Sequence, residues 1–191
     1  MNTFKSTVFC AALALSSGVA AQNAASNPPP ALTQAAPQVD YAGFMGLTAE
    51  VAEYRQARLI QREAFFAKAA EDGGLILDTR SAAAFDAGHI NGAINLPFSD
   101  FTDEKLAKVL GKDTSRAILI YCNNNFSDNA APIMLKAAPL ALNIPTFINL
   151  YGYGYKNVWE LDGVMTTQDV DWIANPDSPL ALRPAPAPLK Q

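Results

Sequence analysis

The sequence predicts an α/β fold: a doubly wound, mostly parallel sheet of about five strands with helices on both faces. Short continuous apolar runs alternate along the chain with segments that carry apolar residues at helical spacing. The runs 75–77 and 117–121 contain no polar alternation, which is typical of strands buried on both faces. Strands that alternate with helices form parallel sheets wrapped on both sides.

Capping residues and glycines delimit the predicted elements. Thr48, Ser81 and Thr102 begin helices, whereas Gly73 and Gly74 end one. The predicted helices cover 48–58, 61–71, 82–86, 102–110 and a run from 129 that Pro139 ends or kinks, with a last helical turn at 156–161. The predicted strands are 59–60, 75–77, 93–96, 117–121 and 146–150, and a turn is expected at 88–92.

The N-terminus has the pattern of an export signal. Lys5, a short apolar run at 7–15 and small residues at 19–21 predict a signal peptide that is cleaved before Gln22. The apolar run is too short to span a bilayer as a stable helix, and an uncleaved anchor is the alternative. We therefore expect a periplasmic or secreted protein without a stable membrane anchor after cleavage. The predicted parts are the signal peptide 1–21, a flexible Ala- and Pro-rich leader 22–46, the domain 47–166 and a Pro-rich tail 167–191.

Charge and composition exclude several classes of protein. The formal net charge of −4 leaves no basic footprint for nucleic acid. One histidine and the one cysteine that lies after the predicted cleavage site cannot build a Cys/His zinc cluster. The sequence contains neither the phosphate-binding nor the dinucleotide-binding glycine motif. We therefore predict no metal, no cofactor and no nucleic-acid partner.

Cys122 is the candidate catalytic residue. It is the only cysteine left once 1–21 is removed, because Cys10 lies in that segment. Exported proteins usually pair their cysteines, so an odd one is a reactive thiol or an intermolecular partner. Cys122 follows the run 117–121, at the strand end where open α/β sheets bind ligands, and the helix expected from 129 would lower its pKa. The alternative is an inert buried cysteine.

A dense motif surrounds the predicted strand at 75–77: Leu77-Asp78-Thr79-Arg80, then Gly88-His89-Ile90 and Gly92-Ala93-Ile94-Asn95-Leu96-Pro97. Together with a cysteine directly after 117–121, and Trp159 and Gly163 further on, this pattern resembles rhodanese-like sulfurtransferase domains over roughly 59–165. The resemblance implies that Cys122 accepts a sulfane sulfur from a small-molecule or protein donor. It would hold that sulfur as a persulfide and pass it to a thiol acceptor. A catalytically silent rhodanese-like module for binding or redox sensing is the alternative.

The same resemblance implies a substrate-binding loop that curls around the cysteine, so that its N–H groups cradle the attached sulfur. The loop residues would be Asn123, Asn124, Asn125, Phe126, Ser127 and Asp128. The family commonly has glycine where this chain has Asn125 and arginine where it has Ser127. Asp128 at the expected loop mouth predicts weak use of anionic donors such as thiosulfate. It also argues against a phosphatase on the same fold, which needs arginine there.

Other polar residues of the motif are expected to be structural. We interpret His89 as a turn residue bonded to nearby backbone, with a general base for Cys122 as the alternative. Asp78 and Arg80 are expected to form a bracing pair. Tyrosines at 151, 153 and 155 either rim a pocket beside Cys122 or pack on the body of the domain.

Overall fold

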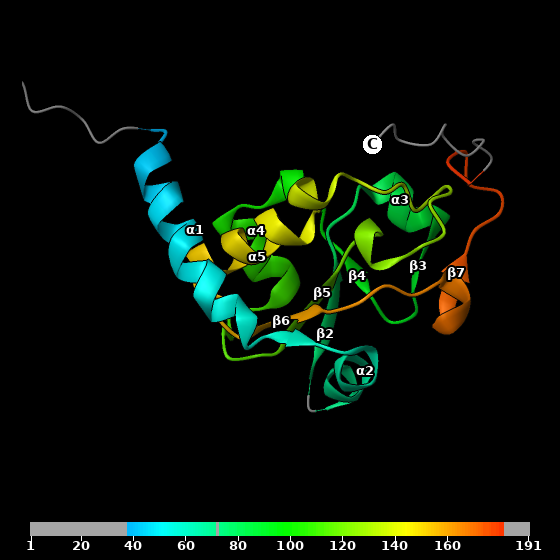
Figure 1. Ribbon diagram of the computed structural model, residues 1–191, viewed down its shortest axis with the longest axis horizontal. Coiled ribbons are helices and arrows are strands. Elements are labelled where there is room, and N and C mark those ends of the chain that lie inside the picture. Colours follow the sequence, from blue (N-terminus) through cyan, green and yellow to red (C-terminus); the bar gives the residue numbers. More distant parts are fainter. Residues whose placement is uncertain (1–37, 72, 182–191) are drawn as a thin grey trace, which may run out of the picture. The chain divides into compact units, whose positions relative to one another are not determined.

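Five parallel strands form the main sheet of the computed structural model, which describes residues 38–71 and 73–181 (Figure 1). Their order across the sheet is β1-β6-β5-β2-β4, and every pairing is parallel. The strands are β1 (Leu59–Ile60), β2 (Leu75–Asp78), β4 (Ile94–Asn95), β5 (Ile118–Tyr121) and β6 (Val158–Leu161). The predicted α/β class with a five-stranded parallel sheet is confirmed.

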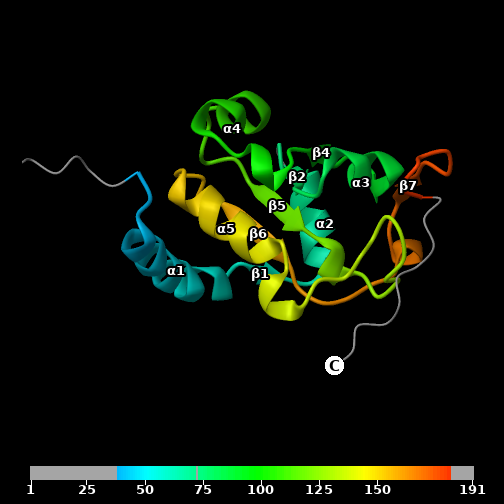
Figure 2. The same ribbon diagram turned by 90° about the horizontal axis from the view of Figure 1, so that it is seen from above.

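Helices cover both faces of this sheet. They are α1 (Tyr41–Gln56), α2 (Arg62–Ala70), α3 (Ala82–Ala87), α4 (Asp103–Leu110) and α5 (Asn143–Gly152). Successive residues of β5 point to opposite faces: Ile118 joins an apolar cluster with residues of α1, α4 and α5, whereas Leu119 joins one with Phe65 of α2. Figure 2 shows α1 beside α5, as in Figure 1. Within the described ranges, no helix has both the length and the apolar character needed to cross a bilayer.

Two of the predicted helix starts are confirmed by their caps. The Ser81 hydroxyl accepts from the Ala84 N–H at 3.2 Å, and the Thr102 hydroxyl accepts from the Lys105 N–H at 3.2 Å. These bonds satisfy N–H groups that have no partner within the helix, so α3 and α4 begin where the sequence predicts.

The first helix begins earlier than predicted. Asp40, not Thr48, is its cap, because the Asp40 carboxylate accepts from the Gly43 N–H at 2.8 Å. Thr48 lies inside α1 and donates to the Phe44 carbonyl at 2.8 Å. Residues 41–46, predicted to belong to the flexible leader, are therefore helical. The predicted signal peptide, most of the leader and the last ten residues of the tail lie outside the described residues.

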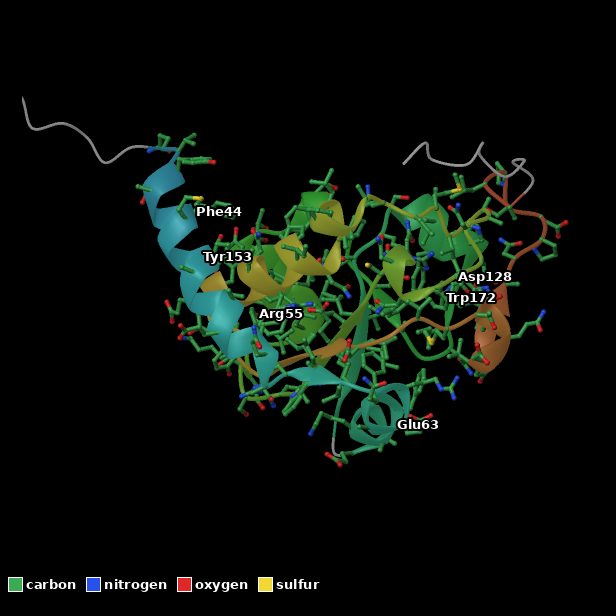
Figure 3. The ribbon with its side chains drawn as sticks, viewed as in Figure 1. Phe44, Arg55, Glu63, Asp128, Tyr153 and Trp172 are labelled. Atoms are coloured by element: carbon green, nitrogen blue, oxygen red, sulfur yellow. The ribbon has the colours of Figure 1, made fainter. Side chains whose placement is uncertain are left out.

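The start of the predicted tail forms a strand. β7 (Trp172–Ala174) pairs antiparallel with β3 (Gly88–Ile90), at a position where the sequence predicts only a turn. Trp172, labelled in Figure 3, packs edge-to-face on Phe126 with ring centroids 5.3 Å apart. A Cβ at Gly88 would lie 2.7 Å from the Trp172 indole nitrogen, so this close approach requires glycine. Aromatic packing therefore orders this part of the chain.

Three predictions between residues 129 and 161 are wrong. No α-helix starts at Asn129, whose left-handed φ of 41° and the nearby Pro132 interrupt a helical path. Residues 146–150 belong to α5 instead of a strand, with Pro145 tolerated in the first turn. Residues 158–161 form β6, between β1 and β5, in place of a helical turn.

Candidate active site

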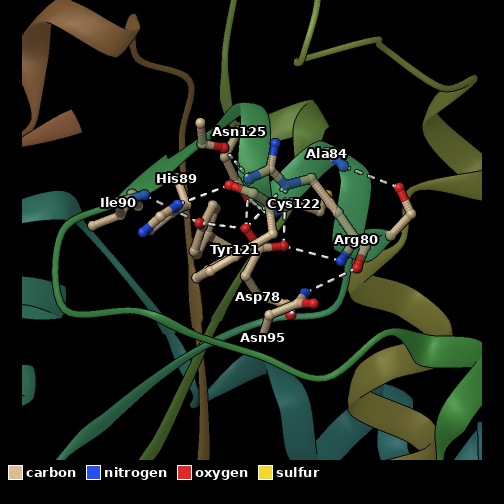
Figure 4. Close-up of polar contacts among 12 residues, drawn as sticks. Asp78, Arg80, Ala84, His89, Ile90, Asn95, Tyr121, Cys122 and Asn125 are labelled. Carbon is tan, nitrogen blue, oxygen red and sulfur yellow. Dashed lines mark hydrogen bonds and ion pairs between the residues drawn. The ribbon is translucent and has the colours of Figure 1, made fainter. Parts of the chain in front are cut away.

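Cys122 lies at the carboxyl end of a central strand. It directly follows β5, and only 1% of its surface is exposed to solvent. Among the described residues it is a free cysteine. The chain segments that follow β2 and β6 reach the same edge of the sheet, because parallel strands end together. Figure 4 shows the polar groups around this strand end.

The thiol faces the start of α5, not a helix that begins at 129. The N–H groups of Asn143, Asn124 and Leu142 are directed at the sulfur. Burial nevertheless raises the pKa of the Cys122 thiol, and the nearby Glu160 carboxylate raises it further against these N–H groups. The expectation of a lowered pKa is therefore wrong for this structure, because desolvation exceeds the effect of the helix end.

The loop after Cys122 is wound into a 3₁₀ turn (η2, Asn123–Asn125). The N–H of Asn125 donates to the Cys122 carbonyl at 3.1 Å, and that of Phe126 donates to the Asn123 carbonyl at 3.1 Å. The Ser127 N–H donates to the Met165 carbonyl at 2.8 Å. The amides of Phe126 and Ser127 are bonded to carbonyls, so they do not contribute to the expected cradle. The N–H groups of Asn124 and Asn125 are the loop donors directed at the Cys122 side chain.

Asn125 ties the loop to its surroundings. Its buried side-chain oxygen accepts from the Cys122 N–H at 2.9 Å and from the Asn143 side chain at 3.1 Å. Its amide nitrogen donates to the carbonyls of Leu161 at 2.9 Å and Gly163 at 3.2 Å. Four bonds join the loop, α5 and the end of β6. Asn125 therefore fixes the position of Cys122.

Three other side chains of the loop contact neighbouring parts of the chain. Asn123 and Asn124 donate to the carbonyls of Met134 and Lys136, each at 2.7 Å. Phe126 is buried against Tyr121, with ring centroids 6.1 Å apart. These contacts hold the segment 134–136 beside the loop.

Asp128 is bonded to Thr167, a residue from a distant segment of the chain. Its carboxylate accepts from the N–H and hydroxyl of Thr167, both at 3.1 Å. It lines a separate hollow with Trp172, which Figure 3 also labels. The expectation that Asp128 guards the sulfur against anions is therefore not supported by its contacts.

Asp78 and Arg80 form the expected bracing pair. The Arg80 guanidinium contacts the Asp78 carboxylate at 2.5 Å and donates to the Gly88 carbonyl at 2.7 Å (Figure 4). The Tyr121 hydroxyl donates to the same carboxylate at 2.6 Å and accepts from the Ile90 N–H at 3.2 Å. This network is buried and joins β2, β5 and β3.

His89 is structural, as expected. Its Nδ1 is 2.8 Å from the Phe85 carbonyl, and its ring stacks on the Phe85 ring at a centroid distance of 3.7 Å. Two of the three tyrosines pack in the core: Tyr151 and Tyr155 are buried, and the Tyr155 hydroxyl donates to the Gly111 carbonyl at 2.9 Å. Tyr153 is 39% exposed. Tyr151 and Tyr155 therefore pack on the body of the domain, which is one of the two alternatives.

A cavity of about 480 Å³ opens next to the start of the loop that follows Cys122. Asn123 and Leu142, which contact or adjoin Cys122, line it together with Arg80 and Lys136. Two buried polar atoms of lining residues, Asn123 Oδ1 and Arg80 Nη1, have no partner within the described part of the chain. Lys136 brings a positive charge that the loop itself lacks. Sequence reasoning missed Lys136, Asn143 and Glu160, because each comes from a distant segment of the chain.

The chain is similar to several solved structures at low sequence identity. The described residues contain no group of three His, Cys, Asp or Glu side chains that could hold a metal ion. A search of curated proteins finds no match. Among solved structures, a rhodanese-like domain from Anabaena sp. is 20% identical, with 70% of this chain and 89% of that chain covered and a TM-score of 0.42. A Lactobacillus plantarum protein is 17% identical (69% and 99% covered, TM-score 0.41), and a Bacillus halodurans protein is 19% identical (61% and 74% covered, TM-score 0.40).

The family model described as "Rhodanese-like domain" matches residues 64–166, which is more than half of the chain and includes Cys122 with its loop. The chain therefore belongs to the rhodanese-like domain family.

Proposed function

We propose that the protein is a sulfurtransferase that carries a sulfane sulfur as a persulfide on Cys122. One observation carries the proposal: a free thiol follows a central strand of a rhodanese-like domain and faces the first N–H groups of α5. Such groups stabilise negative charge at a helix N-terminus. The outer sulfur of a persulfide carries that kind of charge.

The reaction has two balanced steps. The Cys122 thiolate attacks the outer sulfur of a donor persulfide; a new bond to Sγ forms, the donor's S–S bond breaks, and the donor thiolate leaves with the electron pair. An acceptor thiolate then attacks the outer sulfur on Cys122, and the Cys122 thiolate leaves in turn. The net change is transfer of one neutral sulfur atom, so no external oxidant or reductant is required.

The surroundings of the thiol support storage of the sulfur. The N–H groups of Asn143, Leu142 and Asn124 can donate to a negatively charged sulfur without side-chain movement. The cavity lined by Asn123 and Lys136 supplies the approach for a donor. Burial of the thiol limits attack by unrelated thiols and favours donors that fit this cavity.

The partners follow from this chemistry. The donor is a persulfide of a low-molecular-weight thiol or of a protein, and the acceptor is a thiol of either kind. We also propose that transfer takes place outside the cytoplasm, in the periplasm or after secretion, because the N-terminal pattern of 1–21 is that of a cleaved signal.

The test is sulfur transfer by the purified protein. The reduced protein is mixed with glutathione persulfide as donor and cyanide as acceptor, and thiocyanate is measured over time. We expect formation above the uncatalysed rate, and loss of that excess in Cys122→Ser, with the circular dichroism spectrum unchanged. A variant as active as the parent protein would contradict the proposal.

A further inference from the structure

A charged residue outside the matched family domain reaches the sheet beside the thiol. Arg55 lies in the last turn of α1, which ends before residue 64, where the family match begins. Its Nε and Nη2 atoms contact the two carboxylate oxygens of Glu160, each at 2.5 Å. Figure 3 shows Arg55 where α1 meets the sheet. Such a two-pronged pair fixes the carboxylate in both position and orientation.

Glu160 needs this partner. It lies on β6, next to β5, and is 4% exposed. A carboxylate buried without a counter-charge costs several kcal/mol or takes up a proton. The hydrogen bond and the charge of Glu160 in turn raise the pKa of Arg55 despite burial, with Asp162 adding to the effect.

The pair is linked to Cys122 by hydrogen bonds. The Asn143 side chain donates to Glu160 Oε1 at 3.2 Å and to Asn125 Oδ1 at 3.1 Å. That same Asn125 oxygen accepts from the Cys122 N–H at 2.9 Å. Asn143 also directs its backbone N–H at the thiol. Glu160 therefore helps to hold Asn143, whose backbone N–H is directed at the sulfur.

The charges around the thiol come from several elements. Glu160 on β6 disfavours the thiolate, and Arg55 on α1 offsets Glu160. Asp78, at the end of β2, is paired with Arg80. Lys136 lines the cavity beside Asn123. In this set, Glu160 is the carboxylate that raises the pKa of the thiol, and its counter-ion is Arg55.

We propose that Arg55 is a positioning residue for Cys122: by pairing with Glu160 it holds Asn143 toward the sulfur and neutralises the carboxylate beside it. The proposal rests on the proposed function for its biological role. It assigns helix α1, which lies outside the family match, a part in setting the reactivity of the thiol.

The test measures the pKa of the Cys122 thiol from the pH dependence of its alkylation by iodoacetamide. Arg55→Gln should raise that pKa by about one unit, because Glu160 loses its counter-charge and Asn143 loses its anchor. Glu160→Gln should lower it, and the double variant should lie between the two. Arg62→Gln is the matched control: Arg62 pairs with Glu63 and Asp169 on the surface and should not shift the pKa.

Opposite shifts in the two single variants separate positioning from a merely structural role, which would move both in the same direction. If Arg55→Gln does not fold, Arg55→Lys and Glu160→Gln decide the question, since lysine keeps the charge but cannot contact both oxygens. Unchanged thiol pKa values in these folded variants would overturn the proposal. Alkylation needs no sulfur donor, so this result is independent of whether Cys122 accepts sulfur.

Discussion

Replacement of Asn125 by alanine tests whether this side chain fixes the loop that carries the thiol. The substitution removes four hydrogen bonds. It leaves the buried N–H of Cys122 without its acceptor and the Leu161 carbonyl without this donor. Each buried group left unsatisfied costs about 1–3 kcal/mol, so we expect the free energy of unfolding to fall by about 2–6 kcal/mol.

Urea denaturation followed by tryptophan fluorescence measures this loss, with the midpoint and slope fitted separately. Asn124→Ala is the matched control. Asn124 also makes two side-chain bonds, both to the Lys136 backbone, but it does so at the surface. Water can replace those bonds, so we expect a loss below about 1 kcal/mol. Equal losses in the two variants, or a loss below about 1 kcal/mol in Asn125→Ala, would refute the reasoning.

Three further predictions concern the network, the thiol and the cavity. Tyr121→Phe should destabilise the protein by about 1–3 kcal/mol in urea unfolding, because the buried Ile90 N–H loses its acceptor while the Asp78 carboxylate stays bonded to Arg80; no change would show that water takes the place of the hydroxyl. Since burial raises the pKa of Cys122, its alkylation rate should still rise at pH values above about 9.5, where an ordinary thiol with a pKa of about 8.5 has levelled off. The same shift means that folding favours the neutral thiol. The contribution of the thiol to the free energy of unfolding is therefore fully present below the thiol pKa of the unfolded protein. It is lost as the pH rises through the thiol pKa of the folded protein, and Cys122→Ser should remove this pH-dependent loss. Lys136→Ala should slow transfer from thiosulfate more than transfer from a neutral donor, whereas Asp128→Asn should change neither rate; the reverse pattern would place Asp128, not Lys136, at the sulfur.

Local sequence signals predict the elements that depend on local chemistry. The continuous apolar runs of β2 and β5, and the hydroxyl caps of α3 and α4, can be recognised without any tertiary information. The run 146–150 could not be assigned in this way, because its apolar residues suit either a short buried strand or one face of a helix. In the structure, Phe147, Ile148 and Leu150 pack as part of α5.

Distant partners explain what the sequence could not show. β6 contains Glu160, a residue that argues against a strand in the middle of a sheet, and its burial is possible because Arg55 lies against it from 105 positions away. Likewise, Cys122 could be predicted from its position after a strand. Two of the N–H groups that face it belong to Leu142 and Asn143, which adjoin it only after folding.

The most direct test of the proposed chemistry is peptide mass spectrometry of the folded protein after incubation with glutathione persulfide. We expect the peptide that contains Cys122 to gain the mass of one sulfur atom, to lose it on treatment with dithiothreitol, and to show no gain in Cys122→Ser. An unmodified Cys122 in folded protein, with both low-molecular-weight and protein persulfides as donors, would contradict sulfur transfer and favour a binding or redox-sensing module.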